Sequence, residues 1–273
     1  RSPTVTGVQT CALPIYEALG ADVTVISDEP DGININNGCG STHPENLQRK
    51  VVEIGADVGF AYDGDADRLI VVDEKGRIID GDRVLCICGK YLKDIGKLAE
   101  GKITATVMSN IGLHKYLEQH GIDVDVTKVG DRYVLESMLQ TGSVLGGEQS
   151  GHMIFLDYTT TGDGVLSSLQ FMKAYLASGS KLSELRDEIH IYPQALVNAG
   201  VDNAYKQAAL EDEEVKEFIG KVEAKLEGTG RVLIRPSGTE PLIRVMLEGE
   251  DSEEIRERSE EHTSELQSRS AIS

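Results

Sequence analysis

A regular alternation of β-prone runs and helical segments over residues 58–177 is the feature that most constrains the fold. Short apolar runs bounded by turn residues predict strands, and longer segments with apolar residues every three or four positions predict helices. The predicted strands lie at residues 58–61, 69–73, 77–79, 103–108, 124–128, 144–145 and 153–156, and the helices at residues 44–54, 82–93, 113–120, 133–140 and 164–177. This order favours an α/β fold with mostly parallel sheets, and ligand sites at the carboxyl ends of strands.

The two ends of the chain follow other patterns. A helix at residues 212–226 and two strands, at 231–234 and 243–247, predict a small α+β domain. Residues 17–20 are typical of a helix end and residues 22–26 of a strand, so we expect a preceding helix and strand to be missing. The terminal segments, residues 1–15 and 259–273, resemble translated sequencing-adapter sequence. We exclude them from fold and function; ordinary disordered termini are the alternative.

Composition excludes some classes of partner. The formal net charge of −19 disfavours nucleic acid and anionic membranes, and no apolar run approaches the roughly 20 residues of a membrane span. A few arginines, backbone amides and a metal can still bind a phosphorylated substrate. Cys86 and Cys88 lie in an apolar run without the spacing of a zinc site, so we expect buried thiols and a cytoplasmic, reducing environment.

Carboxylates stand on alternate residues directly after a predicted strand, followed by an arginine: Asp63, Asp65, Asp67 and Arg68. Small residues separate the carboxylates, which can therefore turn toward one hard cation, and oxygen ligands suit Mg²⁺. An acidic surface turn and a phosphatase site with Asp63 as nucleophile are alternatives. An EF-hand loop is a further alternative, because Glu74 occupies its twelfth position, although Arg68 stands where that loop needs glycine and strands flank it.

A second polar loop, residues 235–241, lies between the last two predicted strands. With a nearby arginine it offers hydroxyls, backbone N–H groups and two guanidinium groups, which together suit a phosphate dianion. The candidate phosphate ligands are Arg235, Ser237, Gly238, Thr239 and Arg244. A surface hairpin is the alternative, since the proline and glycines would serve either structure.

Glycines flank a third loop, residues 146–152, which carries Glu148, Ser150 and His152. A carboxylate and a hydroxyl are suitable partners for sugar hydroxyls or an amine, while His152 alone is more often structural. Arg132, in a comparable strand-to-helix turn, could meet phosphate or solvate the helix.

Two further polar segments are interpreted as structural. Residues 159–164 indicate a helix entry in which the three threonines at 159–161 and Asp163 offer N-cap oxygens. Ser41 and Thr42 are expected to open the helix at residues 44–54 in the same way.

These loops occur in the order and spacing of the metal-binding, sugar-recognition and phosphate-binding loops of the α-D-phosphohexomutase superfamily. The resemblance covers residues 16–258 and includes connecting segments at residues 29–36 and 128–136. Residues 147–152, together with residues 159–164, most resemble the phosphoglucosamine mutase family, and the phosphomannomutase/phosphoglucomutase family is the nearest relative. We expect two consecutive mixed α/β domains of the phosphohexomutase type followed by a small α+β domain: metal-binding residues 16–90, sugar-recognition residues 91–189 and phosphate-binding residues 190–258.

The resemblance implies a reaction and a role for each loop. Family members convert glucosamine 6-phosphate to glucosamine 1-phosphate for UDP-N-acetylglucosamine synthesis, through a phosphoserine enzyme and a bisphosphosugar. The three aspartates would hold Mg²⁺ together with the phosphoserine, and Arg68 would assist proton or phosphate handling. Glu148 and Ser150 would bind sugar hydroxyls, Arg132 would also bind substrate, and His152 would contact sugar or phosphate. The non-reacting phosphate would be anchored by Arg235, Ser237, Gly238, Thr239 and Arg244.

The sequence departs from the family at its start. The superfamily's first domain, with a Ser-His-Asn-Pro-type catalytic loop, has no counterpart here. We therefore expect no mutase turnover from this chain alone, and the sequence does not indicate its oligomeric state. A noncatalytic phosphosugar-binding module is the alternative from a different functional class.

Overall fold

The computed structural model describes residues 3–6, 9–203, 205–226, 229–237, 240–250 and 255. The chain forms two compact units, Arg1–His190 and Ile191–Ser273. The predicted start of the last domain, residue 190, lies next to this division. Across the described residues, every helix is too short or too polar to traverse a lipid bilayer.

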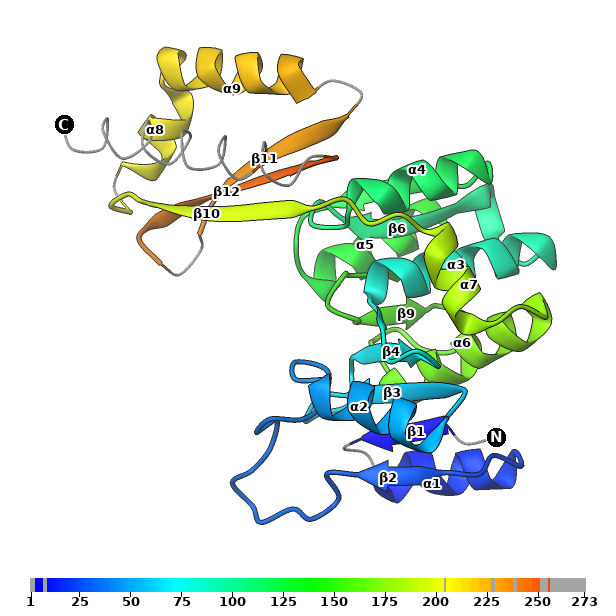
Figure 1. Cartoon of the computed structure of the whole chain (residues 1–273). Helices are drawn as coiled ribbons and strands as arrows, with labels where there is room; N and C mark the ends of the chain where they lie inside the picture. Colours follow the sequence, from blue (N-terminus) through cyan, green and yellow to red (C-terminus); the bar gives the residue numbers. More distant parts are fainter. Residues whose placement is uncertain are drawn as a thin grey trace. The chain divides into compact units, whose positions relative to one another are not determined.

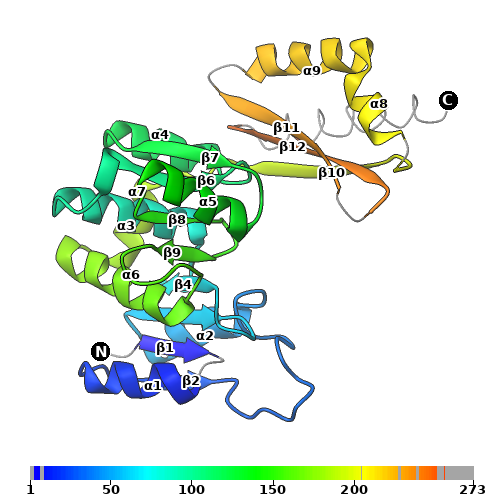
Figure 2. The same cartoon turned by 180° about the vertical axis from the view of Figure 1, so that it is seen from behind.

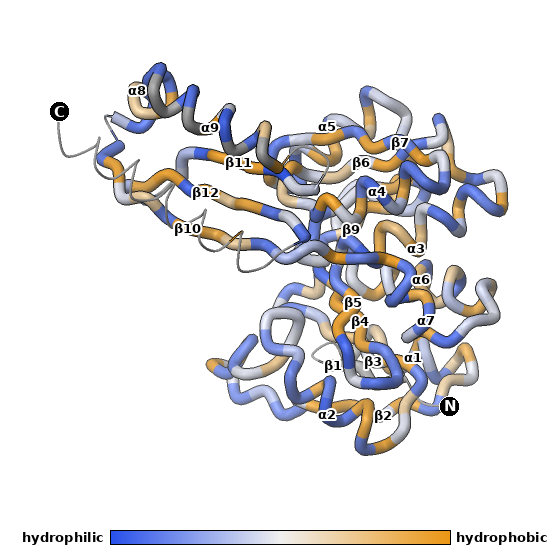
Figure 3. Tube along the Cα trace, turned by 45° about the horizontal axis from the view of Figure 1, so that its top comes forward, coloured by the Kyte–Doolittle hydropathy of each residue, from blue (hydrophilic) through white to orange (hydrophobic). Residues whose placement is uncertain are grey.

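The first unit begins with a five-stranded mixed sheet of order β2-β1-β3-β4-β5 (Figure 1). Its strands are β1 (Pro3–Thr6), β2 (Thr24–Ile26), β3 (Val58–Tyr62), β4 (Leu69–Asp73) and β5 (Ile78–Ile79). Strand β1 pairs in parallel with β2 and β3, whereas β3, β4 and β5 are antiparallel. Every residue of β3 and β4 is buried, and Figure 3 shows these strands as largely hydrophobic segments. The predicted hairpin at residues 69–79 is confirmed.

Part of the terminal segment that we excluded takes part in this sheet. Residues Pro3–Thr6 form β1, and helix α1 (Gln9–Ala18) follows. The helix predicted to end near residue 20 is therefore α1, and these residues supply the helix and strand that we expected to be missing. Excluding residues 3–6 and 9–15 from the fold was therefore wrong. The adapter-like origin of the segment stays a prediction.

Helix α2 (Glu45–Ile54) covers one face of the first sheet. It buries Leu47 and Val51 against Gly59 of β3, where a Cβ atom would lie 2.6 Å from the Val51 side chain. The prediction that Ser41 and Thr42 cap this helix is wrong. Its N-cap is Pro44 without a side-chain hydrogen bond. Ser41 lies three residues before this position, and its N–H donates to the Tyr62 carbonyl at 3.0 Å.

Three hydroxyl groups join α1, β3 and α6 (Gly164–Ser178) inside the first unit. The Tyr62 hydroxyl donates to Ser168 Oγ at 3.0 Å and lies 2.7 Å from the Tyr16 hydroxyl. The Tyr16 ring stacks on Phe60 with ring centroids 5.7 Å apart. Burial raises the pKa of both tyrosines, so both hydroxyls stay protonated at neutral pH.

The second sheet has the order β7-β6-β8-β9. Its strands are β6 (Lys102–Thr106), β7 (Asp123–Thr127), β8 (Leu145–Gly147) and β9 (Met153–Phe155), and its helices are α3 (Gly81–Asp94), α4 (Ile111–Gln119) and α5 (Asp131–Thr141). Strand β6 pairs in parallel with β7 and β8, and β9 is antiparallel to β8. Figures 1 and 2 show α4 and α5 on opposite faces of this sheet. The expected domain boundary after residue 90 lies inside α3.

Helix α7 (Leu182–Glu188), which we did not predict from the sequence, docks on the β4-β5 hairpin. Arg77 pairs with buried Asp73 and with Asp187 of α7, each at 2.9 Å. The Ser183 N–H donates to Glu74 Oε2 at 3.0 Å. Glu74 therefore binds a helix terminus in a strand-to-strand turn, which contradicts the EF-hand alternative.

The second unit is an antiparallel sheet of order β10-β12-β11 with two helices. Its elements are β10 (Gln194–Gly200), α8 (Lys206–Glu211), α9 (Glu213–Leu226), β11 (Gly230–Pro236) and β12 (Leu242–Gly249). Inward-facing residues of β12, among them Val245 and Leu247, form its core with Leu226 of α9. The predicted α+β architecture is confirmed, but β10 and α8 were not predicted.

Cys86 and Cys88 are buried free thiols on α3, as predicted. Burial raises the pKa of the Cys88 thiol to about 12, so this side chain is unreactive at neutral pH.

Candidate functional site

The acidic loop, residues 63–68, connects β3 to β4 and brings its three carboxylates together. One oxygen each from Asp63, Asp65 and Asp67 lies within 4.8 Å of the other two. The loop curls because the Ala66 N–H donates to the Asp63 carbonyl at 3.1 Å and Ala66 adopts a left-handed φ of 60°. Alternate side chains therefore turn to the same side, as the sequence predicted.

The acidic loop fits a divalent cation. Octahedral oxygen ligands of Mg²⁺ lie about 3 to 4 Å apart, so small side-chain movements would bring all three carboxylates into range. Asp67 Oδ1 is buried and accepts no hydrogen bond. Burial raises the pKa of Asp63, and interaction with the neighbouring Asp67 carboxylate raises it further. These negative groups crowd together, and a cation would relieve their repulsion.

Arg68 contributes the positive charge closest to these carboxylates along the chain. Its Nε lies 3.8 Å from Asp63 Oδ2 and 3.9 Å from Asp67 Oδ1, and its backbone N–H donates to Asp63 Oδ1 at 3.1 Å. The guanidinium thus touches the acidic loop without forming close hydrogen bonds to it. This position leaves its donors available to an anion beside the metal site.

Glycines of two distant segments let their backbones pack directly against the acidic loop. Gly151 has a φ of +96°, and a Cβ there would lie 2.3 Å from the Leu69 carbonyl oxygen. At Gly162, a Cβ would lie 2.7 Å from the Asp67 carbonyl oxygen and 2.4 Å from the His152 ring. The Gly164 N–H donates to the Ala66 carbonyl at 2.8 Å. The candidate sugar-recognition loop, residues 146–152, and the helix entry at residues 159–164 are therefore packed against the acidic loop and the start of β4.

His152 connects these segments through both of its ring nitrogens. Nδ1 lies 3.0 Å from Asp67 Oδ2, and Nε2 accepts the Gly162 N–H at 3.1 Å. Because Nε2 is the acceptor, the ring proton is assigned to Nδ1, which donates to Asp67. His152 is only 5% exposed. The structure places His152 to orient a candidate metal ligand, and its expected contact with sugar or phosphate stays a prediction.

Replacing His152 by alanine should weaken divalent-metal binding by about 10- to 100-fold, because the Asp67 carboxylate would lose the group that orients it. A titration of the chain with Mn²⁺ by electron paramagnetic resonance measures this affinity. His120→Ala is a matched control, since His120 bonds the Tyr116 carbonyl away from the acidic loop. Unchanged Mn²⁺ affinity in His152→Ala would contradict the orienting role.

The predicted sugar-recognition residues lie in the same unit as the acidic loop. Glu148 Oε1 accepts the Gly130 N–H at 3.0 Å, and the Gly81 N–H at the start of α3 donates to the Gln149 carbonyl at 3.1 Å. Ser150 is exposed. Arg132 is also exposed and pairs with Glu136 at 2.8 Å, so in this structure it forms a surface ion pair along α5.

The second unit holds the candidate phosphate loop by itself. Arg235 and Arg244 face each other across β11 and β12. Burial lowers the pKa of Arg235, and the charge of Arg244 lowers it further. Two guanidinium groups held side by side could bind one phosphate together, so these residues remain the candidate phosphate ligands. Ser237 is 9% exposed and its Oγ accepts the Glu240 N–H at 3.2 Å, whereas Gly238 and Thr239 lie outside the described residues.

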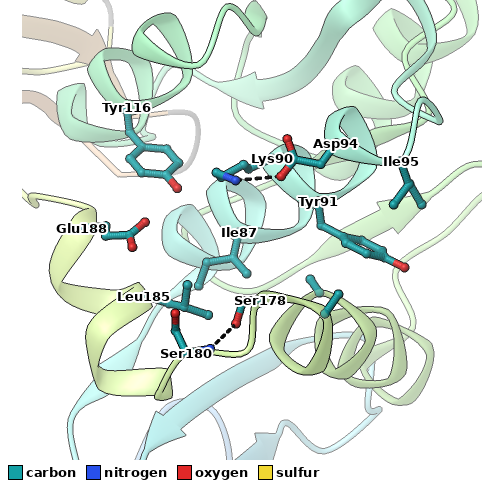
Figure 4. Close-up of a pocket in the computed structure, with 12 residues that line it drawn as sticks. Ile87, Lys90, Tyr91, Asp94, Ile95, Tyr116, Ser178, Ser180, Leu185 and Glu188 are labelled. Atoms are coloured by element: carbon teal, nitrogen blue, oxygen red, sulfur yellow. Dashed lines mark hydrogen bonds and ion pairs between the residues drawn. The ribbon is translucent and has the colours of Figure 1, made fainter.

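Two cavities differ in their relation to these loops. One, of about 620 Å³, is lined by most of the residues between 27 and 40 together with Tyr62, Asp63 and Gly64, and so opens on the acidic loop. The other, of about 320 Å³, lies at the C-terminal ends of α3 and α6 (Figure 4). None of the predicted site residues lines the second cavity. Only the first cavity is therefore connected with the candidate chemistry.

Three residues with contacts in these sites were missed from the sequence: Gly162, Gly164 and Lys206. The two glycines were interpreted only as part of a helix entry, and a glycine-rich turn is a signal that could have suggested close backbone approach. Lys206, described below, carries no recognisable sequence signal.

Comparison with known proteins identifies the family. Residues 80–192 match the alpha/beta/alpha domain III of phosphoglucomutase/phosphomannomutase, and residues 196–263 match the C-terminal domain. The chain is 54% identical to the phosphoglucosamine mutase of Streptococcus agalactiae over 92% of this chain and 56% of that protein. It is 55% identical to that of Ruminiclostridium cellulolyticum, over 93% of this chain and 56% of that protein. The chain thus spans little more than half the length of these relatives.

Solved structures show the same fold. A phosphoglucomutase/phosphomannomutase family protein from Burkholderia thailandensis superposes with a TM-score of 0.77 at 23% identity, over 99% of this chain and 61% of that one. An N-acetylphosphoglucosamine mutase from Aspergillus fumigatus, solved with GlcNAc-6P and magnesium, gives a TM-score of 0.71 at 20% identity, over 99% and 60%.

The chain therefore belongs to the phosphoglucomutase/phosphomannomutase family, with domain III followed by the C-terminal domain IV. The predicted fold class is confirmed. Within this family the chain is a homologue of the phosphoglucosamine mutases, which confirms the resemblance stated from the sequence.

Proposed function

We propose that this chain carries the metal-binding, sugar-binding and phosphate-binding loops of a phosphoglucosamine mutase. The enzyme would interconvert glucosamine 6-phosphate and glucosamine 1-phosphate through a phosphoserine and a bisphosphosugar, and supply UDP-N-acetylglucosamine synthesis. The observation that carries the proposal is the attachment of the acidic loop to the sugar-recognition loop by the isolated bridge between Arg68 and His152 and by the Asp67–His152 hydrogen bond. This attachment supports a metal site beside a sugar site.

Each group of side chains has its own role in this proposal. Asp63, Asp65 and Asp67 would hold Mg²⁺, which when bound neutralises charge on the transferring phosphoryl group. Arg68 would bind an oxygen of that phosphoryl group with the guanidinium that lies along the edge of the acidic loop. Glu148 and Ser150 would accept and donate hydrogen bonds to the sugar hydroxyls or its amine. In the second unit, Arg235, Ser237 and Arg244, with Gly238 and Thr239, would anchor the non-reacting phosphate.

We further propose that this chain alone lacks mutase turnover, because in the family the phosphoryl donor is a serine of a preceding domain. Purified chain should bind glucosamine 6-phosphate in calorimetry but form no glucosamine 1-phosphate. The same chain fused behind the preceding domains of the Streptococcus agalactiae relative should be active. Conversion by the chain alone would contradict the proposed inactivity.

Substrate choice is tested with the same fusion. Phosphomannomutase/phosphoglucomutase activity is the alternative, because the matching domain models include those enzymes. Faster turnover of mannose or glucose phosphates than of glucosamine phosphates would favour it. An inactive fusion that still binds phosphosugar would favour a noncatalytic binding module.

A further inference from the structure

Lys206 is a buried cation at the candidate phosphate loop. It is the first residue of α8 and is only 8% exposed. Its Nζ donates to the carbonyl oxygens of Ser237 at 2.6 Å and of Glu240 at 2.5 Å. These two carbonyls stand on either side of residues 238–239, so one ammonium group holds both sides of the loop.

Two backbone hydrogen bonds also hold the loop. One lies within the hairpin, and the other comes from the segment between β10 and α8. The Ser237 N–H donates to the Leu242 carbonyl at 2.9 Å, which closes the hairpin between β11 and β12. The Val201 N–H, just after β10, donates to the Pro241 carbonyl at 3.0 Å. Lys206 adds the side-chain contact that ties α8 to the loop, and it fixes the direction of two carbonyl groups.

The charge of Lys206 is also significant. In the described part of the chain, no carboxylate lies within ion-pair distance of its Nζ, which is instead solvated by the two carbonyls. The loop's own carboxylate, Glu240, pairs with Arg244 at 2.6 Å. The positive charge of a buried ammonium without a carboxylate partner is not neutralised locally, so it can attract an anion nearby. Arg235, the cross-strand neighbour of Arg244, adds a further positive charge beside the same loop.

We propose that Lys206 is a positioning residue for phosphate-monoester binding. It draws the two carbonyls inward, so that they do not repel the anion, and it adds positive charge behind the loop. Its Nζ is committed to these carbonyls and does not contact the phosphate itself. The inference rests on the proposed function of residues 235–244 as the phosphate site, and it adds a residue from outside that loop.

The test measures binding of glucosamine 6-phosphate and inorganic phosphate to the whole chain by calorimetry, with Arg235→Ala as a site control. Lys206→Met should raise both dissociation constants at least tenfold, and Lys206→Arg should keep them within about threefold of wild type. Lys221→Met, on the exposed face of α9 where Lys221 pairs with Glu217, should change neither. Rescue by arginine distinguishes charged positioning from simple filling of space.

The outcomes separate the two proposals. If the wild-type chain binds neither ligand, the proposed phosphate site fails. If wild type binds, Arg235→Ala weakens binding and a folded Lys206→Met binds like wild type, the role of Lys206 is refuted. Should Lys206→Met not fold, Lys206→Gln replaces it, because its amide can donate to one carbonyl without charge. Weakened binding by Lys206→Gln supports the role, and wild-type binding overturns it.

Discussion

Asp65→Asn is expected to reduce divalent-metal affinity more than about 100-fold, since loss of a group that only orients a ligand already costs 10- to 100-fold. Asp65 is the most informative of the three aspartates because it is exposed, so its replacement perturbs the fold least. Titration with Mn²⁺ measures the affinity. Asp94→Asn, which breaks the Lys90–Asp94 pair on α3, is the control and should bind Mn²⁺ as wild type does.

The same variant, although it binds metal more weakly, should be more stable than wild type when no metal is present. In chelator, Asp65→Asn should melt at a higher temperature than wild type, because one of three crowded negative charges is gone. With saturating Mg²⁺, wild type should gain stability and the variant should not. Equal melting shifts by Mg²⁺ in both proteins would show that the acidic loop is not the metal site.

Gly151→Ala should lower the free energy of unfolding by about 3 kcal/mol, through left-handed backbone strain and a steric clash together. The new Cβ would lie 2.3 Å from the Leu69 carbonyl oxygen at a φ of +96°. Urea denaturation measures the change, and Mn²⁺ affinity should fall with it, because the acidic loop would be displaced.

Gly179 provides a matched comparison for this substitution. It has a φ of +67° at the end of α6, but a Cβ there meets nothing within 4 Å. Gly179→Ala should therefore lower the free energy of unfolding by only about 1 kcal/mol, through left-handed backbone strain alone, and leave metal affinity unchanged. If both alanine variants lose equal stability, the contact between Gly151 and Leu69 contributes nothing.

The sequence predicted most elements of the first unit because their periodicity is strong. The strands at residues 58–61 and 69–73 are continuous apolar runs, and both are fully buried as β3 and β4. It failed for β10, whose alternating exposed and half-buried residues give a weak apolar signal. This strand is stabilised by its pairing with β12, about fifty residues later, which no local pattern reveals.

Site residues could be predicted where all the side chains of a site lie in one short loop of the sequence. The carboxylates of Asp63, Asp65 and Asp67 meet because they alternate in a short turn. The roles of His152 and Gly162 could not be predicted in the same way, because they depend on contacts with Asp67 that close only in the folded chain. Asp163 was one of the N-cap candidates offered by the sequence, since capping is a local property, and it accepts the Leu166 N–H at 2.9 Å.

The cluster of Tyr16, Tyr62 and Ser168 has a practical consequence for spectroscopy. The chain contains nine tyrosines and no tryptophan, so tyrosine emission is not masked by energy transfer to indole. Tyr62 is fully buried and immediately precedes Asp63. Its near-ultraviolet dichroism and fluorescence should therefore respond when a cation enters the acidic loop. Such a response would report metal binding without a dye or label.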